Sequence, residues 1–186
     1  MDREIGVKGI ELNSKYFSGQ YRPRVYWSNI DFENVNLDKY NRNIKDYLEK
    51  KPDEKYFFDL NPNKIKKLKN SNKLKHGINK IYLIPRELLK DNERQRRVYD
   101  IRGKSPTLLA RSDTPKIYIN NKIRKLTPLE CERLQGIPDN YTSLASDTQR
   151  YKMIGNAFTV SVIEHFLKGL EKNPVIKKRI KQETLF

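Results

Sequence analysis

The sequence predicts a protein that mixes short β-strands with helices, and three features of its 186 residues support this. Ile10 and Leu12 alternate with polar neighbours, which is typical of a short strand. Val25-Tyr26-Trp27 has the β-branched and aromatic content of a buried strand. In the last third of the chain, a helix-start signal at Thr127 and apolar residues at helical spacing after Thr159 predict helices.

The first of these helices is predicted over residues 128–135. Thr127 and Glu130 form a capping box, in which each side chain accepts from the other residue's backbone N–H, and Pro128 occupies the first helical position. Gly136 suits a left-handed helix end, and Pro138 prevents continuation. The helix is therefore started and stopped by its own sequence.

The second helix is predicted from Thr159 onward. Asn156 and Thr159 are both plausible caps, and Gly155-Asn156 interrupts the preceding polar segment. One buried stripe is expected to contain the apolar residues at helical spacing, which are Val160, Ile163, Phe166, Leu167 and Leu170. On these patterns alone, the region is an ordinary helical hairpin.

Further elements are predicted between these regions. Residues 97–99 and 116–119 have the composition of strands, and an apolar strand is expected at 107–109 after a turn with Gly103 and Pro106. Residues 37–50 show helical spacing, and residues 85–90 are predicted to form a short helix opening on proline.

The charge of the chain favours a polyanionic partner. Lys and Arg number 39 against 23 Asp and Glu, which gives a net charge of +16 and a pI near 9.8. Nucleic acid is the first candidate for such a partner. A lysine-rich composition without functional meaning is the alternative.

Cysteine and histidine content limits the classes of site. The single cysteine, Cys131, excludes an internal disulfide and fits a reducing cytoplasm. His76 and His165 are isolated, so no metal site is expected. No apolar run approaches the length of a membrane span, and no membrane association is expected.

Three motifs together frame almost the whole chain. From Arg124 to Tyr141 the sequence reads R-x-L-T-P-x-E-x-x-R-L-Q-G-I-P-D-x-Y, and I-G-N-A follows at 154–157 with a valine at 162. This resembles the ninth and tenth motifs of the DNA cytosine-5 methyltransferases. Q-x-R-x-R at 20–24, followed by V-Y-W, resembles the eighth motif of the same family.

The resemblance implies an α/β fold: the C-terminal part of a class I SAM-dependent methyltransferase fold plus a mixed α+β target recognition lobe. Residues 1–30 would end the catalytic domain with the eighth motif. Residues 31–122 would form the target recognition domain. Residues 123–186 would hold the ninth and tenth motifs, with a helix returning to the catalytic domain.

The same resemblance implies roles for individual residues. Arg24 would contact the target cytosine, Arg22 would orient it or bind phosphate, and Gln20 would support that arrangement through hydrogen bonds. The spacing of the two arginines, which enter the strand of Val25-Tyr26-Trp27, predicts that they point the same way, and two solvated surface arginines are the alternative. The tenth-motif residues Gly155, Asn156 and Ala157 would lie beside the S-adenosylmethionine pocket.

Other residues are expected to contact DNA. The string Gly-Lys-Ser-Pro-Thr-Leu at 103–108 resembles the end of the family's recognition domain, and a purely structural turn is the alternative there. The expected DNA contacts are Lys104, Ser105, Thr107, Arg111 and Arg124.

Essential parts of the family's chemistry do not occur in this sequence. The family uses a Pro-Cys nucleophile, a Glu-Asn-Val glutamate and a glycine-rich cofactor loop, whereas this chain has no Pro-Cys and no G-x-G. Glu33-Asn34-Val35 follows the eighth motif instead of preceding it and is interpreted as coincidence. Cys131, between Glu130 and Glu132, is expected to be structural because neighbouring carboxylates raise a thiol pKa.

Two main hypotheses follow. The chain is either the C-terminal subunit or fragment of a DNA cytosine-5 methyltransferase, inactive alone, or a non-catalytic DNA-binding or regulatory protein derived from one. The first hypothesis requires double-stranded DNA, an N-terminal methyltransferase subunit and S-adenosylmethionine bound with that missing half, in the cytoplasm of a bacterial or phage-infected cell. Gln20, Arg22, Arg24 and Asn156 favour it, since a pure DNA binder needs neither a base contact nor a cofactor-side asparagine. A third hypothesis, a basic RNA-binding protein, is disfavoured by the motifs.

Overall fold

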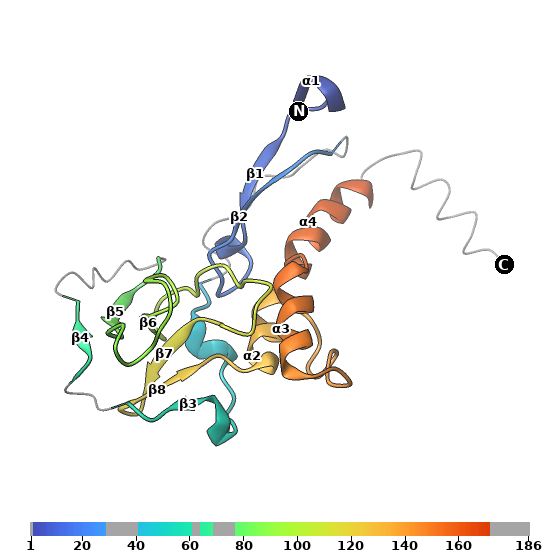
Figure 1. The fold of residues 1–186 in the computed structure, drawn as a ribbon. Helices are drawn as coiled ribbons and strands as arrows, with labels where there is room; N and C mark the ends of the chain where they lie inside the picture. The colour runs from blue at the N-terminus through green and yellow to red at the C-terminus, as the bar shows by residue number, and fades with distance from the viewer. Residues whose placement is uncertain (1, 29–40, 61–63, 69–76, 172–186) are drawn as a thin grey trace.

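The computed structural model describes residues 2–28, 41–60, 64–68 and 77–171 (Figure 1). Within them a six-stranded sheet forms one side of the molecule, and a β-hairpin with a long helix beside it projects from the other (Figure 1). Residues 33–35, which spell Glu-Asn-Val, lie outside the described residues, as does part of the helix expected over 37–50.

The sheet has the order β3-β8-β7-β6-β5-β4. All neighbouring strands run antiparallel except β6 and β7, which are parallel. Two of its strands, over 97–100 and 116–119, were predicted. The bounds are β3 Phe57–Phe58, β4 Lys66–Lys67, β5 Lys80–Leu83, β6 Arg97–Asp100, β7 Lys116–Ile119 and β8 Lys122–Lys125.

A tight turn joins β7 to β8. Asn120 and Asn121 have φ values of 49° and 61°, the left-handed conformations that a two-residue hairpin turn requires and that asparagine tolerates. Because β8 pairs with β7 along its whole length, the domain boundary predicted after residue 122 falls inside the sheet. The ninth motif therefore begins on a strand of this sheet.

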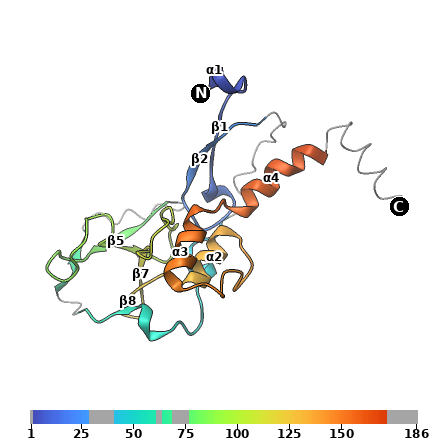
Figure 2. The ribbon, with the colours of Figure 1, turned by 45° about the vertical axis from the view of Figure 1, so that its right-hand side comes forward.

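The hairpin consists of β1 Ile10–Asn13 and β2 Pro23–Tyr26, with α1 Asp2–Ile5 at its far end (Figure 1). The 3₁₀ helix η1, Ser14–Tyr16, follows β1. Helix α4, Val160–Glu171, packs against the hairpin, and its C-terminal end leans away from the two strands in Figure 2. β2 was predicted to be buried, but Val25 is 46% exposed because α4 covers only one face of the two strands.

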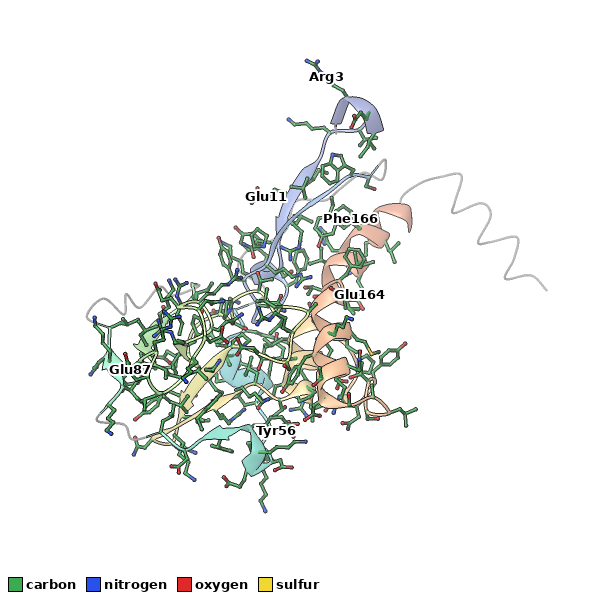
Figure 3. All side chains as sticks on the ribbon, in the orientation of Figure 1. Arg3, Glu11, Tyr56, Glu87, Glu164 and Phe166 are labelled. Atoms are coloured by element: carbon green, nitrogen blue, oxygen red, sulfur yellow. The ribbon has the colours of Figure 1, made fainter. Side chains whose placement is uncertain are left out.

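A small apolar cluster holds α4 to the hairpin. Leu12 and Phe17 pack against Val162 and Phe166, and the rings of Tyr26 and Phe166 lie 5.0 Å apart (Figure 3). The predicted stripe of α4 needs one correction: Val162 is buried, whereas Leu167 is 50% exposed. The buried face includes Val162 because this residue packs against the hairpin, and the side chain of Leu170 lies outside the described residues.

The main core lies between the sheet and the helices α2, Pro128–Gln135, and α3, Asp147–Asn156. α2 has the predicted bounds, both capping-box hydrogen bonds are present, and Gly136 ends it at φ 74°. α3 was not predicted, because only Tyr151, Ile154 and Gly155 of its residues are buried and its sequence is otherwise polar.

Other local predictions differ from the structure. Residues 107–109 belong to no strand, because their polar groups bond to residues near the hairpin instead of to a neighbouring strand. Residues 85–90 form only a turn, in which the N–H of Leu89 bonds to the carbonyl of Pro85. Two 3₁₀ helices, η2 Ile44–Tyr47 and η3 Glu54–Tyr56, complete the described elements.

Candidate functional site

Arg22 connects the hairpin to the end of α3. Its side chain is 7% exposed, and its guanidinium donates hydrogen bonds of 3.1 Å to each of the carbonyl oxygens of Leu108, Gly155 and Ala157. Burial, with a smaller effect from nearby Arg24, lowers the pKa of Arg22 from its ordinary value. The side chain still carries its charge, since arginine does not deprotonate in proteins. Arg22 therefore joins the eighth motif to the tenth.

A second set of hydrogen bonds extends this connection to α2. The Gln135 amide donates to the carbonyl of Ile154 at 2.9 Å. The Thr159 hydroxyl donates to Oε1 of Gln135 at 2.9 Å, so the Ser14 hydroxyl, 2.8 Å from it, acts as the donor to Thr159. We call Ser14, Arg22, Gln135 and Thr159 the polar junction. It ties the hairpin to α2 and to the turn between α3 and α4.

Gly155 is required by close packing. A Cβ built at this position would lie 2.3 Å from the backbone carbon and oxygen of Leu109, so no larger residue fits without movement of the backbone. The carbonyls of Gly155 and Ala157 already bond to Arg22. Asn156, between them, is exposed. Of the three residues expected beside the cofactor, Asn156 alone therefore has a polar side chain, and that side chain is exposed to solvent.

Arg24 differs from Arg22 in its surroundings. It lies on β2, is exposed, and its guanidinium donates to the carbonyl of Pro23 at 2.7 Å. The two arginines were predicted to point the same way, but Arg22 precedes the strand and turns into the interior. Of these two arginines, only Arg24 exposes its guanidinium to solvent.

Gln20 takes part in the structure through its backbone. It forms a parallel bridge with Ser105, supported by hydrogen bonds of 2.7 Å from the N–H of Ser105 to Gly19 and from the N–H of Tyr21 to Ser105. The side chain is fully buried, yet neither amide atom has a hydrogen-bond partner in the described part of the chain. The hydrogen bonds predicted for this side chain are therefore not found there.

Three of the five residues expected to contact DNA lie inside the fold. Lys104 is 1% exposed and its ammonium donates to the carbonyls of Ser18, at 3.0 Å, and Arg42. Burial lowers the pKa of Lys104 to about 8. Ser105 is fully buried in its bridge with Gln20. The Lys104 ammonium and the backbone of Ser105 thus bind residues at the base of the hairpin, and neither side chain faces solvent.

Arg124 is the third. It is 1% exposed and forms a bidentate ion pair with Glu130, with both N–O distances at 2.7 Å. Glu130 also accepts from the backbone N–H groups of Thr127 and Glu49, each at 2.9 Å. This pair fixes the start of α2 against β8, and the charge of Arg124 is not available to DNA.

The remaining two expected DNA contacts lie nearer the surface. Thr107 is half-buried and its hydroxyl donates to the carbonyl of Tyr21 at 3.0 Å. Arg111 is exposed. Arg111 is therefore the one residue of the predicted set that presents its charge to solvent.

The cysteine and the residue after it both have structural roles. Burial raises the pKa of the Cys131 thiol, and the carboxylates of Glu130 and Glu132 raise it further, which confirms that this thiol is unsuited to be a nucleophile. Sequence reasoning missed Glu132, which is fully buried and accepts from the backbone N–H groups of Asn140 and Thr142, each at 2.9 Å. It also assigned Thr159 only to a helix cap. A buried carboxylate beside a polar loop gives no periodic signal in the sequence.

In the described ranges, no group of three or more His, Cys, Asp or Glu side chains is placed to hold a metal ion. No helix in the same ranges has the length and apolar character needed to cross a membrane.

Curated proteins similar to this chain are methyltransferases. The chain is 42% identical over 69 residues to the type II methyltransferase M.BanI of Aneurinibacillus aneurinilyticus, covering 36% of this chain and 16% of that protein. It is 26% identical over 230 aligned positions to the orphan methyltransferase M.SPBetaI of Bacillus phage SPbeta, covering 91% of this chain and 52% of that protein. The chain thus spans about half the length of the phage enzyme, and less of M.BanI.

The fold is also shared with solved methyltransferases. The crystal structure of S. pombe Dnmt2 methyltransferase superposes with a TM-score of 0.57 at 16% sequence identity, covering 92% of this chain and 59% of that one. The Entamoeba histolytica methyltransferase EhMeth gives a TM-score of 0.58, covering 89% of this chain and 53% of that one. The model of the C-5 cytosine-specific DNA methylase family matches residues 12–172. The chain therefore belongs to the C-5 cytosine-specific DNA methylase family.

Proposed function

We propose that this chain supplies DNA recognition and the last part of the active site of a DNA cytosine-5 methyltransferase. The observation that carries the proposal is the polar junction, in which Arg22 binds the carbonyls of Gly155 and Ala157. It brings the eighth and tenth motifs together, although 133 residues separate Arg22 from Gly155. Arg24, two residues after Arg22, is exposed, and so is Asn156, which lies between Gly155 and Ala157. A protein that only bound DNA would need neither an arginine that contacts the target base nor an asparagine beside the cofactor.

The lobes receive different roles in this proposal. The hairpin, which ends within residues 1–30, and α4 belong to the catalytic lobe, and the six-stranded sheet serves target recognition. β8 joins that sheet, so the recognition lobe extends to the start of α2. A partner subunit, N-terminal in the family's order, supplies the Pro-Cys nucleophile, the Glu-Asn-Val glutamate and the cofactor loop.

The residues of this chain then act by positioning. The Arg24 guanidinium donates to O2 of the target cytosine, and Arg22 holds the strand that carries it against α3. The Asn156 amide would hold S-adenosylmethionine on the side of the tenth motif. The bound cofactor supplies the methyl group that is transferred to C5 of the cytosine.

The purified chain alone is expected to transfer no methyl group to DNA, because its sequence contains neither a Pro-Cys pair nor a G-x-G loop. The measurement is incorporation of tritiated methyl groups from S-adenosylmethionine into double-stranded DNA. The positive control is the same chain mixed with a methyltransferase segment that carries the three missing motifs. Incorporation by the chain alone would contradict the proposal. The proposal would also be wrong if the chain formed stable complexes with such segments and none of these complexes transferred a methyl group.

DNA binding by the chain is expected to weaken steeply as salt increases. The net charge is +16, and each phosphate contact releases counterions, so log affinity should fall linearly with log salt between about 50 and 200 mM. Replacing exposed Lys67 on β4 by Gln should reduce this slope by about 1, whereas Lys168→Gln on α4 should leave it unchanged. Fluorescence anisotropy with a labelled duplex measures both. An affinity that does not change with salt would remove the electrostatic basis of the proposal.

A further inference from the structure

The recognition sheet contains an aromatic hollow that the proposed function leaves unused. It has a volume of about 400 Å³ and is lined by residues of β3, β8, β7 and β5, four strands of the same sheet. Its aromatic walls are Phe57, Phe58, Tyr82 and Tyr118. The rings of Tyr82 and Tyr118, from strands on either side of β6, lie 5.0 Å apart edge to face. Four aromatic side chains therefore form a large part of the lining.

Polar groups at the same hollow offer both donors and acceptors. The Lys122 ammonium lies 5.5 Å from the centre of the Phe57 ring, and Glu54, Asp59 and Asn121 also line the space. The two carboxylates oppose a phosphate or another anion inside the hollow. A neutral, planar group with apolar faces and a polar edge fits these walls, and a nucleobase has this chemistry.

A second hollow continues the first along the sheet. Its volume is about 470 Å³, and it shares Tyr82, Tyr118 and Asn121 with the aromatic hollow. Lys67 lines it, and Lys66 and Lys67 of β4 are both exposed. A base in the first hollow would therefore have cations beside it, where the sugar and phosphate of a nucleic acid chain continue.

We propose that the aromatic hollow binds one unpaired nucleobase of a DNA strand, with the adjacent backbone following Lys67. Stacking of a base on aromatic side chains is tolerant of sequence and strengthens binding several-fold. The carboxylates of Glu54 and Asp59 favour bases with an exocyclic amino group, so adenine and cytosine should bind better than thymine. This inference depends on the DNA-binding part of the proposed function and not on methyl transfer.

The test compares two DNA duplexes that differ only by one bulged adenine. The full chain is expected to bind the bulged duplex at least about fivefold more tightly than the paired one at the same salt concentration. A bulged 2-aminopurine in place of the adenine should lose fluorescence on binding, because it stacks on the aromatic walls. Equal affinities for the two duplexes would overturn the inference, and salt-sensitive binding of both would leave the proposed function standing.

Variants locate the effect within the fold. Phe57→Leu and Tyr118→Leu should each abolish the preference for the bulged duplex and the fluorescence loss, while affinity for paired DNA stays within about twofold. Tyr118→Phe should keep both, since it retains the ring and loses only the hydroxyl that bonds to Asn121. Phe158→Leu, at a ring 64% exposed between α3 and α4, is the matched control outside the hollow and should also keep both.

Two further outcomes decide the source of the base. If free adenosine competed for binding as strongly as the bulged duplex, the inference that the hollow binds a base within a DNA strand would be wrong, and the hollow would be assigned to a free nucleoside. Self-association of the chain that Tyr118→Leu abolishes, measured by sedimentation, would assign the hollow to a second copy and also overturn the inference. Circular dichroism of each variant tests whether the fold is retained. Lys122→Gln, at an exposed residue, is an independent variant that should also lose the preference for the bulged duplex.

Discussion

Arg24→Ala is expected to lower methyl-transfer turnover by about 100-fold or more in a complex with a segment that supplies the missing motifs. Arg24 is exposed on β2, so its guanidinium is free to reach a base, whereas Arg22 is committed to three carbonyls in the interior. A contact to O2 strengthens as charge shifts onto the ring during attack at C6. The loss should therefore fall on turnover more than on DNA affinity.

Separate measurements of kcat and of the DNA dissociation constant distinguish these effects. Arg24→Lys should recover little, because an ammonium lacks the planar fork of the guanidinium. Arg111→Ala removes another exposed arginine and should weaken binding while it spares turnover on saturating DNA. If Arg24→Ala reduced affinity and left turnover intact, Arg24 would be an ordinary phosphate contact, and its proposed role at the base would be wrong.

Glu130→Ala is expected to reduce the free energy of unfolding by about 3–5 kcal/mol. In the unchanged protein, two guanidinium nitrogens of Arg124 each lie 2.7 Å from a carboxylate oxygen of Glu130. The change leaves this guanidinium buried without its carboxylate. It also removes the acceptor of the backbone N–H groups of Thr127 and Glu49. An unpaired buried charge and two unpaired donors together account for a loss of this size.

Urea denaturation of the variant and of two controls measures this loss. Glu93→Ala breaks an ion pair of 2.8 Å with Arg97, but the Glu93 side chain is 61% exposed, so the expected loss is below about 1 kcal/mol. Glu130→Gln keeps an acceptor for one backbone N–H and should fall between the two. Equal losses for Glu93→Ala and Glu130→Ala would show that the burial of the Arg124 pair has no energetic importance.

Local signals explain which elements could be predicted from the sequence. α2 was predicted residue by residue because its cap, its proline and its glycine stop all lie within its own segment. α3 was missed because it buries few side chains and its position depends on Gly155 packing against the backbone of Leu109. That contact joins residues distant in sequence, so no local pattern encodes it.

At the candidate site, the sequence likewise identified residues but did not predict where their side chains lie. The motifs identified Arg22, Arg24 and Asn156 as residues of interest, but they did not indicate that Arg22 turns inward while the other two stay exposed. Lys104 and Arg124 were expected to face DNA because they are basic and lie in strings that resemble the end of the recognition domain and the ninth motif. Their burial depends on acceptors that the tertiary fold brings to them, at Ser18 and Glu130. The presence of a basic residue in a sequence does not indicate whether its side chain is buried or exposed.

The polar junction also sets an order of events during synthesis of the protein. Ser14 bonds to Thr159, which is 145 residues further along the chain. At about 5–20 residues per second, a ribosome needs roughly 7–30 s to make the intervening segment. Throughout that interval the hairpin has no α4 to cover Leu12 and Phe17, and a two-stranded hairpin is marginally stable by itself. β1 and β2 are made before α4 and are thus secured only after it, and a nascent chain of this protein should remain a chaperone substrate until residue 166 has emerged.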